Sequence, residues 1–124
     1  MNDIKQDNLI FKIFPSFTHP YILLMRLDRP IGFLLLFYPI SFSLVSQSNY
    51  DFELLKYFIL FFIGSVAMRS AGCIINDILD KKIDEKVKRT QSRPLASSKL
   101  SVLKACITLA LMLMIGLLIL INLN

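Results

Sequence analysis

The stretch CIINDILDKKID, residues 73–84, places an asparagine and three aspartates at the end of an apolar run. On a helix that turns about 100° per residue, Asn76 and Asp80 share a narrow arc. Asp77 and Asp84 lie at the edge of that arc. Asn76 and Asp80, like Asp80 and Asp84, are one helical turn apart, which separates such side chains by about 6 Å. Carboxylates this close repel one another or take up protons unless a positive group lies between them.

A hard divalent cation is the positive group that fits these residues best. Oxygen ligands select magnesium or manganese over zinc, and Cys73 is the one nearby sulfur or imidazole ligand. Magnesium keeps some of its water ligands and bridges a few carboxylates to substrate phosphates. We therefore expect Mg²⁺ to be the cofactor of this stretch.

Basic residues follow the acids directly, in the sequence KVKRTQSRPL, and they are Lys86, Lys88, Arg89 and Arg93. The arginine fork matches phosphate oxygens in a bidentate way, and lysine acts as a point charge. Acids that suit a metal and bases that suit a phosphate thus stand together at the end of an apolar run. This arrangement predicts a magnesium-diphosphate site for a substrate carried in the lipid.

The spacing alone is equally compatible with acids and bases that neutralise one another in a solvated loop. Arg69 favours the site, because it lies inside the apolar run, where a charge costs at least ~2.5 kcal/mol. Such a residue usually faces a polar cavity and a partner, and Asn76 and Asp80 share its face. Arg26 and Arg29 are likewise arginines at the end of an apolar run, the first predicted span. Anchoring at a membrane surface explains them equally well.

The composition indicates the elements that position these residues. Of the 124 residues, 55% are hydrophobic and only 19% are charged, with a mean hydropathy of +0.60, which is typical of a membrane protein. A spanning helix needs about 20 apolar residues. Pro30 suits a helix start, and Ser98 or Ser101 suits an N-cap. We expect an all-α membrane protein with an interfacial N-terminal segment, three spans and a loop, at residues 1–20, 22–45, 54–75, 100–123 and 76–99.

The distribution of charge predicts the orientation of these spans. The formal net charge is +5, and the loop after the second predicted span holds most of the cations. Cytoplasmic loops collect lysine and arginine, so this loop and the N-terminus should face the cytoplasm. A basic stretch can also indicate nucleic-acid binding. Here the cations alternate with acids between two spans, and we expect no nucleic-acid partner.

Two motifs resemble a known family. RSAGCIINDILDKKIDEKVKRTQSRPL is similar to the first aspartate-rich motif, N-D-x-x-D-x-x-x-D, of the UbiA-type intramembrane prenyltransferases, with matches at Asn76, Asp77, Asp80 and Asp84. A VKRTxxRPL tail follows at residues 87–95. MRLDRPIGFLLLFYP, in the first predicted span, resembles the N-terminal signature of the 4-hydroxybenzoate polyprenyltransferases of ubiquinone synthesis. Together the two motifs extend the resemblance over about residues 20–105.

The resemblance implies a fold and a reaction. The family forms a bundle of nine spans in the inner membrane, around a central cavity that opens to lipid. Two aspartate-rich motifs on its cytoplasmic side hold magnesium and the diphosphate of a polyprenyl donor. Loss of diphosphate develops an allylic carbocation, which the ring of 4-hydroxybenzoate attacks ortho to its hydroxyl. The polyprenyl diphosphate, the 4-hydroxybenzoate and the lipid bilayer are therefore the expected partners.

The resemblance also implies roles for individual residues. Metal ligands are expected at Asn76, Asp80 and Asp84, with Asp77 as a supporting member. Asp80, Asp84 and Lys81 are expected to be catalytic. Diphosphate binding is expected at Lys88, Arg89 and Arg93. Apart from the resemblance, the position of Arg69 inside the apolar run leads us to expect that it also contacts substrate. Arg26 or Arg29 is expected to meet the carboxylate of the aromatic acceptor.

The sequence departs from the family pattern in one respect. Residues 100–124 hold no second aspartate-rich motif, and the sequence ends after the third predicted span. We therefore expect a truncated or split chain that is inactive alone and is completed by a separate chain carrying the remaining helices. The alternative is a non-catalytic three-span remnant with at most weak magnesium-diphosphate binding. Because no acid of the first motif is lost, we expect either a recent truncation or a partner chain.

Overall fold

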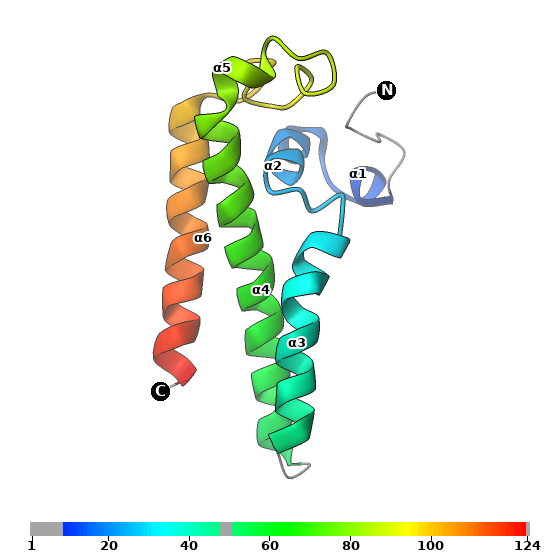
Figure 1. Cartoon of the computed structure of the whole chain (residues 1–124), viewed down its shortest axis with the longest axis vertical. Helices are drawn as coiled ribbons and strands as arrows, with labels where there is room; N and C mark the ends of the chain where they lie inside the picture. Colours follow the sequence, from blue (N-terminus) through cyan, green and yellow to red (C-terminus); the bar gives the residue numbers. More distant parts are fainter. Residues whose placement is uncertain (1–8, 48–50, 124) are drawn as a thin grey trace.

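The computed structural model describes residues 9–47 and 51–123, and within these ranges every regular element is a helix. The elements are α1 (Leu9–Ile13), the 3₁₀ helix η1 (Ser16–Thr18), α2 (His19–Leu24), α3 (Ile31–Gln47), α4 (Phe52–Leu79), α5 (Lys81–Asp84) and α6 (Val102–Leu123). Helix α4 lies between α3 and α6 and packs on both (Figure 1). The short helices α1, α2 and α5 gather at one end of these three, together with the loop that follows α5.

Two of the three predicted spans are confirmed as continuous helices. Residues 54–75 lie inside α4, and residues 100–123 nearly coincide with α6. Both helices are long and apolar enough to cross a membrane, whereas α3, with 17 residues, is shorter. The described part of the chain thus contains two long apolar helices and a shorter one, and a count of three spans remains a prediction.

The predicted span at residues 22–45 is wrong as a single helix. Helix α2 ends at Leu24, and α3 begins only at Ile31. After α2 the amide of Leu27 donates to the carbonyl of Ile22 at 3.1 Å, and the amide of Arg26 donates to that of Leu23 at 3.2 Å. This is the hydrogen-bond pattern of a Schellman cap, which needs a left-handed residue just after the helix. Arg26 supplies it, with a φ of 53°.

The second half of the break follows from Pro30. A proline disfavours the α conformation in the residue before it and lacks an N–H to donate. Helix α3 therefore starts directly after Pro30, as the sequence predicted.

The start of α6, after the loop at residues 85–101, is capped by a serine. The hydroxyl of Ser101 accepts a hydrogen bond from the amide of Lys104 at 3.3 Å. Ser101 is thus the N-cap of α6, and Ser98 is not.

The buried core lies at the end where the short helices gather. It consists of Leu24, Ile74, Leu95, Leu100 and Ala105, all at most 5% exposed. These residues come from α2, α4, the loop and α6. Burying them fixes α2 and the loop over the last turns of α4, because each buried aliphatic side chain contributes about 1.5–3 kcal/mol. The acidic stretch is therefore covered from two sides.

Candidate functional site

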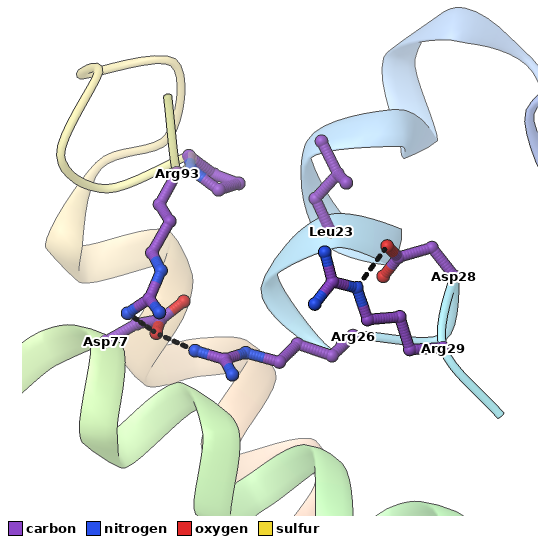
Figure 2. A pocket seen from close by; sticks show the side chains of 7 residues that line it. Leu23, Arg26, Asp28, Arg29, Asp77 and Arg93 are labelled. Atoms are coloured by element: carbon purple, nitrogen blue, oxygen red, sulfur yellow. Dashed lines mark hydrogen bonds and ion pairs between the residues drawn. The ribbon is translucent and has the colours of Figure 1, made fainter. Parts of the chain in front are cut away.

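The site is built around the carboxylate of Asp77, in the last turn of α4. Asp77 is 2% exposed, although it is charged and lies at a helix end. Its Oδ1 accepts a hydrogen bond from Arg26 Nη2 at 3.1 Å and one from Arg93 Nη1 at 3.3 Å. Figure 2 shows the two guanidinium groups reaching this carboxylate from the α2–α3 connection and from the loop. A buried carboxylate persists only with partners of this kind.

Arg93 joins Asp77 to Asp84, the last residue of α5. Arg93 Nη1 donates to Asp84 Oδ2 at 2.9 Å, so one guanidinium nitrogen lies within hydrogen-bond reach of both carboxylates. The side chain of Arg93 is only 16% exposed. In this structure Arg93 is therefore the positive group that such close carboxylates require.

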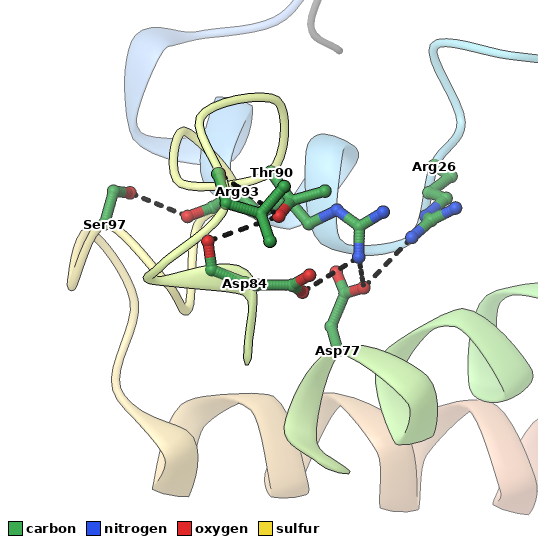
Figure 3. A network of polar contacts seen from close by, with 7 residues as sticks. Arg26, Asp77, Asp84, Thr90, Arg93 and Ser97 are labelled. Carbon is green, nitrogen blue, oxygen red and sulfur yellow. Dashed lines mark hydrogen bonds and ion pairs between the residues drawn. The ribbon is translucent and has the colours of Figure 1, made fainter. Parts of the chain in front are cut away.

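The loop that carries Arg93 is fixed by its own hydrogen bonds (Figure 3). Thr90 Oγ1 donates to the carbonyl of Asp84 at 3.2 Å, and Ser97 Oγ donates to the carbonyl of Arg93 at 2.8 Å. Pro94 and Leu95, directly after the arginine, are buried. The backbone on both sides of Arg93 is thus held in place, and the guanidinium is aimed at α4.

A small cavity of about 30 Å³ opens beside this network. It is lined by Leu23, Arg26, Asp28, Arg29, Asp77, Arg93 and Pro94. Arg29 Nε lies 3.7 Å from Asp28 Oδ2, on the wall opposite Asp77 (Figure 2). Three arginines and two aspartates give the lining a net positive charge. The volume suits a single water-sized group such as one oxygen of an anion.

The remaining predicted residues lie around this network, not in it. Asn76 and Asp80 are exposed on the end of α4, and so are Lys88 and Arg89 on the loop, while Lys81 is half-buried. The expected acidic face therefore divides in two. Its edge, at Asp77 and Asp84, is buried against arginines, and its centre, at Asn76 and Asp80, faces outward.

Arg69 lies farther down α4, where its side chain crosses to the start of α3. A Cβ atom added to Gly32 would come within 2.7 Å of Arg69 Nε, so the absence of a side chain at Gly32 makes room for this guanidinium. Arg69 does not line the cavity. Arg69 thus lies about two helical turns before Asp77 on α4.

The predicted magnesium ligands differ in how well they fit a metal ion. Among residues 9–47 and 51–123, no three acidic, histidine or cysteine residues converge closely enough to form a metal-binding cluster. The exposed amide and carboxylate oxygens of Asn76 and Asp80 are of the kind that magnesium prefers. Asp77 does not fit, because its carboxylate is buried and faces two guanidinium groups. Asp84 is also buried, and in this structure its carboxylate is paired with Arg93 instead of being open to a metal ion.

Two features of the site were missed from the sequence. One is the pairing of Arg26 with Asp77, which are 51 residues apart. The other is Asp28, which lines the cavity beside Arg29. The available signal was that charged residues flank Pro30 next to an apolar helix, because buried charges in such places need partners of opposite sign.

Comparison with known proteins supports the motif resemblance. The sequence profile of the UbiA prenyltransferase family matches residues 34–124. A mitochondrial 4-hydroxybenzoate polyprenyltransferase of Drosophila pseudoobscura pseudoobscura is 44% identical over 124 residues, which cover 97% of this chain and 30% of the relative. A 4-hydroxybenzoate octaprenyltransferase of Legionella pneumophila (strain Paris) is 47% identical over 103 residues, which cover 83% of this chain and 36% of the relative. No solved structure matches the chain significantly.

The matched part is the N-terminal part of these relatives. A 4-hydroxybenzoate octaprenyltransferase of Pseudoalteromonas translucida (strain TAC 125) gives the same picture, with 50% identity over 90 residues that cover 73% of this chain and 30% of the relative. The chain spans about a third of the length of the curated relatives it matches.

Proposed function

Because this chain belongs to the UbiA prenyltransferase family, we propose that it forms the N-terminal part of a transferase that moves a polyprenyl group from polyprenyl diphosphate to 4-hydroxybenzoate in ubiquinone synthesis. The observation that carries the proposal is the 44% identity to a 4-hydroxybenzoate polyprenyltransferase over 97% of the chain. The geometry supports it, since acids and bases meet at one end of a group of apolar helices.

The proposed site lies where the helices leave the membrane. Helices α3, α4 and α6 would span the bilayer, and the α5 loop and the N-terminal segment would face the cytoplasm, where lysine and arginine accumulate. The short helices α1, α2 and α5 lie at the same end of the molecule, as this orientation requires (Figure 1). A polyprenyl chain could then stay in the lipid while its diphosphate reaches the basic loop.

The residues of this chain would act on the diphosphate mainly through charge. Lys88, Arg89 and Arg93 place cations on the loop beside the acids, and fixed positive charges stabilise a departing diphosphate. Asn76 and Asp80 are the exposed residues we propose for holding Mg²⁺, and Asp84, buried and paired with Arg93 in this structure, would join them on releasing that arginine. When bound, this ion would neutralise further charge on the leaving group. Lys81, half-buried next to Asp80, would supply another cation at the same place.

The acceptor would bind at the small cavity beside the network. Arg26 and Arg29 line the small cavity, where a carboxylate oxygen of 4-hydroxybenzoate would meet two guanidinium groups. Bidentate recognition of a carboxylate by arginine is common because the two groups match in shape and charge. Arg93 lines the same cavity, so the acceptor carboxylate would lie next to the donor diphosphate, with Arg26 in reach of both anions.

A chimera tests the proposal without depending on the chain alone. This chain would replace the matching N-terminal part of the Legionella pneumophila octaprenyltransferase, and membranes would be supplied with 4-hydroxybenzoate, octaprenyl diphosphate and magnesium. We expect a prenylated product that is lost on Asp80→Ala but kept on Glu85→Gln, which changes an exposed acid outside the motif. A folded chimera that makes no product would contradict the proposal and favour a non-catalytic diphosphate-binding protein. Expression of the chain alone is the second arm, in which we expect no product.

A further inference from the structure

We propose that Asp77 is a positioning residue that holds Arg26 and Arg93 in place for an anion, and that it does not bind the metal ion itself. The proposal rests on the proposed function only in taking diphosphate as the anion. The proposal is based on one observation: a single buried carboxylate oxygen of Asp77 accepts hydrogen bonds from two arginines that belong to different segments of the chain.

The first observation is that the carboxylate of Asp77 is buried and already faces two cations. Its side chain is 2% exposed, and Arg26 and Arg93 approach the same Oδ1 at 3.1 and 3.3 Å. A hydrated magnesium ion needs accessible oxygens and keeps several of its waters. Asp80, three residues farther along, is exposed and offers such oxygens. The two neighbouring aspartates of the motif thus have opposite environments, and only one of them suits a metal.

The second observation concerns the backbone of Arg26. This residue has a φ of 53°, in the left-handed region that glycine adopts without strain. Glycine is the usual residue at this place after a helix, because any Cβ is crowded there. In this chain an arginine occupies this position, and its guanidinium reaches Asp77. The strained backbone therefore aims a long side chain at one particular carboxylate.

The third observation is where the two arginines point. Arg26 and Arg93 both line the cavity of about 30 Å³, and Asp77 lies between them on its wall. Arg93 is additionally tied to Asp84, whereas Arg26 comes from the α2–α3 connection. Asp77 is thus the common anchor of two segments that are joined to α4 from different sides (Figures 2 and 3). Without it, each arginine would lose the contact that fixes its position relative to the other.

The direction in which anion affinity changes when Asp77 is neutralised separates a positioning role from a role as metal ligand. Removing a negative charge beside an anion site strengthens anion binding, provided that the arginines stay where they are. If Asp77 positions the arginines, its neutralisation weakens anion binding instead, even with no metal present. If Asp77 is a metal ligand, the loss of binding appears only when magnesium is added.

The test compares Asp77→Asn with Asp80→Asn, two isosteric changes that remove the same charge at the same helix end. Inorganic diphosphate binding to the full chain in detergent micelles would be measured by calorimetry, without and with Mg²⁺. We expect Asp77→Asn to weaken metal-free binding roughly tenfold, the loss of one charge-assisted contact. Asp80→Asn should leave metal-free binding unchanged or stronger and reduce only the gain from Mg²⁺. Metal-free binding that is equal or tighter in Asp77→Asn would overturn the proposal.

Amide hydrogen exchange provides an independent readout. In Asp77→Asn we expect faster exchange in residues 19–30 and 85–101 and unchanged exchange in α6, because only the two anchored segments lose their contact. Unchanged exchange in both segments would contradict the proposal. If the unaltered chain binds no diphosphate, the proposed function loses its support, and the exchange data alone decide the role of Asp77.

Arg26→Lys covers the case in which Asp77→Asn does not fold. Lysine keeps the charge but is a point donor that lacks the guanidinium fork. We expect faster exchange in residues 19–30 only, together with weaker metal-free diphosphate binding. Diphosphate binding that stays at the level of the unaltered chain would count against the positioning of Arg26 by Asp77.

Discussion

The two ends of the long helices are packed in different ways. At the polar end, by which we mean α2, residues 25–30, α4 from Ile74 onward, α5 and residues 85–101, side chains are buried in a core and in an arginine–aspartate network. At the opposite, apolar end, α3, α4 and α6 expose large aliphatic and aromatic side chains, among them Phe42, Phe52, Leu120 and Ile121. Only the polar end resembles the interior of a water-soluble protein.

This difference shows which contacts fix the arrangement of the helices. Helices in lipid gain little from apolar contacts with one another, because lipid tails are as apolar as leucine. The contacts that fix a unique arrangement must then come from the end that meets water, where apolar burial and charge pairing both contribute. The same contacts that hold the loop in place also aim Arg26 and Arg93 at Asp77, so stability and the proposed site share their residues.

The largest effect is expected from Arg93, which neutralises two buried carboxylates. In Arg93→Gln, Asp77 and Asp84 lose their shared partner and repel one another. Removing one member of a buried ion pair costs about 4 kcal/mol. The free energy of unfolding, measured by titrating SDS into detergent micelles, should fall by this amount. Lys88→Gln, an exposed cation on the same loop, should change it by less than about 0.5 kcal/mol. Equal losses in the two variants would show that loop charge matters and the buried network does not.

The next effect compares two isoleucines in the two environments. Ile74 is fully buried in the core of the polar end, and Ile121, near the end of α6 in the apolar end, is 61% exposed. Ile74→Ala should lower the free energy of unfolding by about 3 kcal/mol, because truncation leaves a cavity among Leu24, Leu95 and their neighbours. Ile121→Ala should cost less than about 1 kcal/mol in the same SDS titration. A loss at Ile121 as large as that at Ile74 would mean that the apolar end is packed as tightly as the polar end.

A smaller effect isolates the backbone of Arg26 from its side chain. Both Arg26→Gly and Arg26→Ala lose the ion pair with Asp77, so both should be less stable than the unaltered chain. The glycine variant should nevertheless be more stable than the alanine variant by about 1 kcal/mol, since only alanine has a Cβ that is crowded at a φ of 53°. Equal stability of the two variants in the SDS titration would show that the left-handed conformation is not kept in solution.

The same residue explains what could be predicted from the sequence. The helices at 54–75 and 100–123 were predictable because each is a long apolar run that nothing interrupts. The run at 22–45 is almost as apolar, yet it is broken by an arginine in the left-handed conformation. A hydropathy average over about 20 residues does not detect a break of a few residues. Pro30 gave the start of α3 correctly, but no residue type in the sequence marks the end of α2, where glycine would have been the usual signal.

The candidate site was predictable in its residues and less so in its contacts. The helical spacing placed Asp77 and Asp84 at the edge of an acidic face, and these two are the aspartates that meet Arg93. Arg26 joins them from 51 residues away, and spacing along one helix carries no information about such a partner. Whether a charged residue is buried depends on the tertiary packing, which is why the burial of Asp77 and the exposure of Asp80 could not be predicted from the sequence.

The smallest effect is expected at Gly32, where α3 passes the side chain of Arg69. Gly32→Ala gains less than about 1 kcal/mol of helix propensity, because Gly32 lies in the first turn of α3, and its Cβ would come within 2.7 Å of Arg69 Nε. Arg69 is flexible and exposed, so its side chain should move aside, and the two effects should nearly cancel. In an Arg69→Ala background the same glycine change should show the full propensity gain, up to about 1 kcal/mol, in the SDS titration. The same small change in both backgrounds would show that Arg69 does not cross over Gly32, and the contact between the start of α3 and α4 would then depend on other residues.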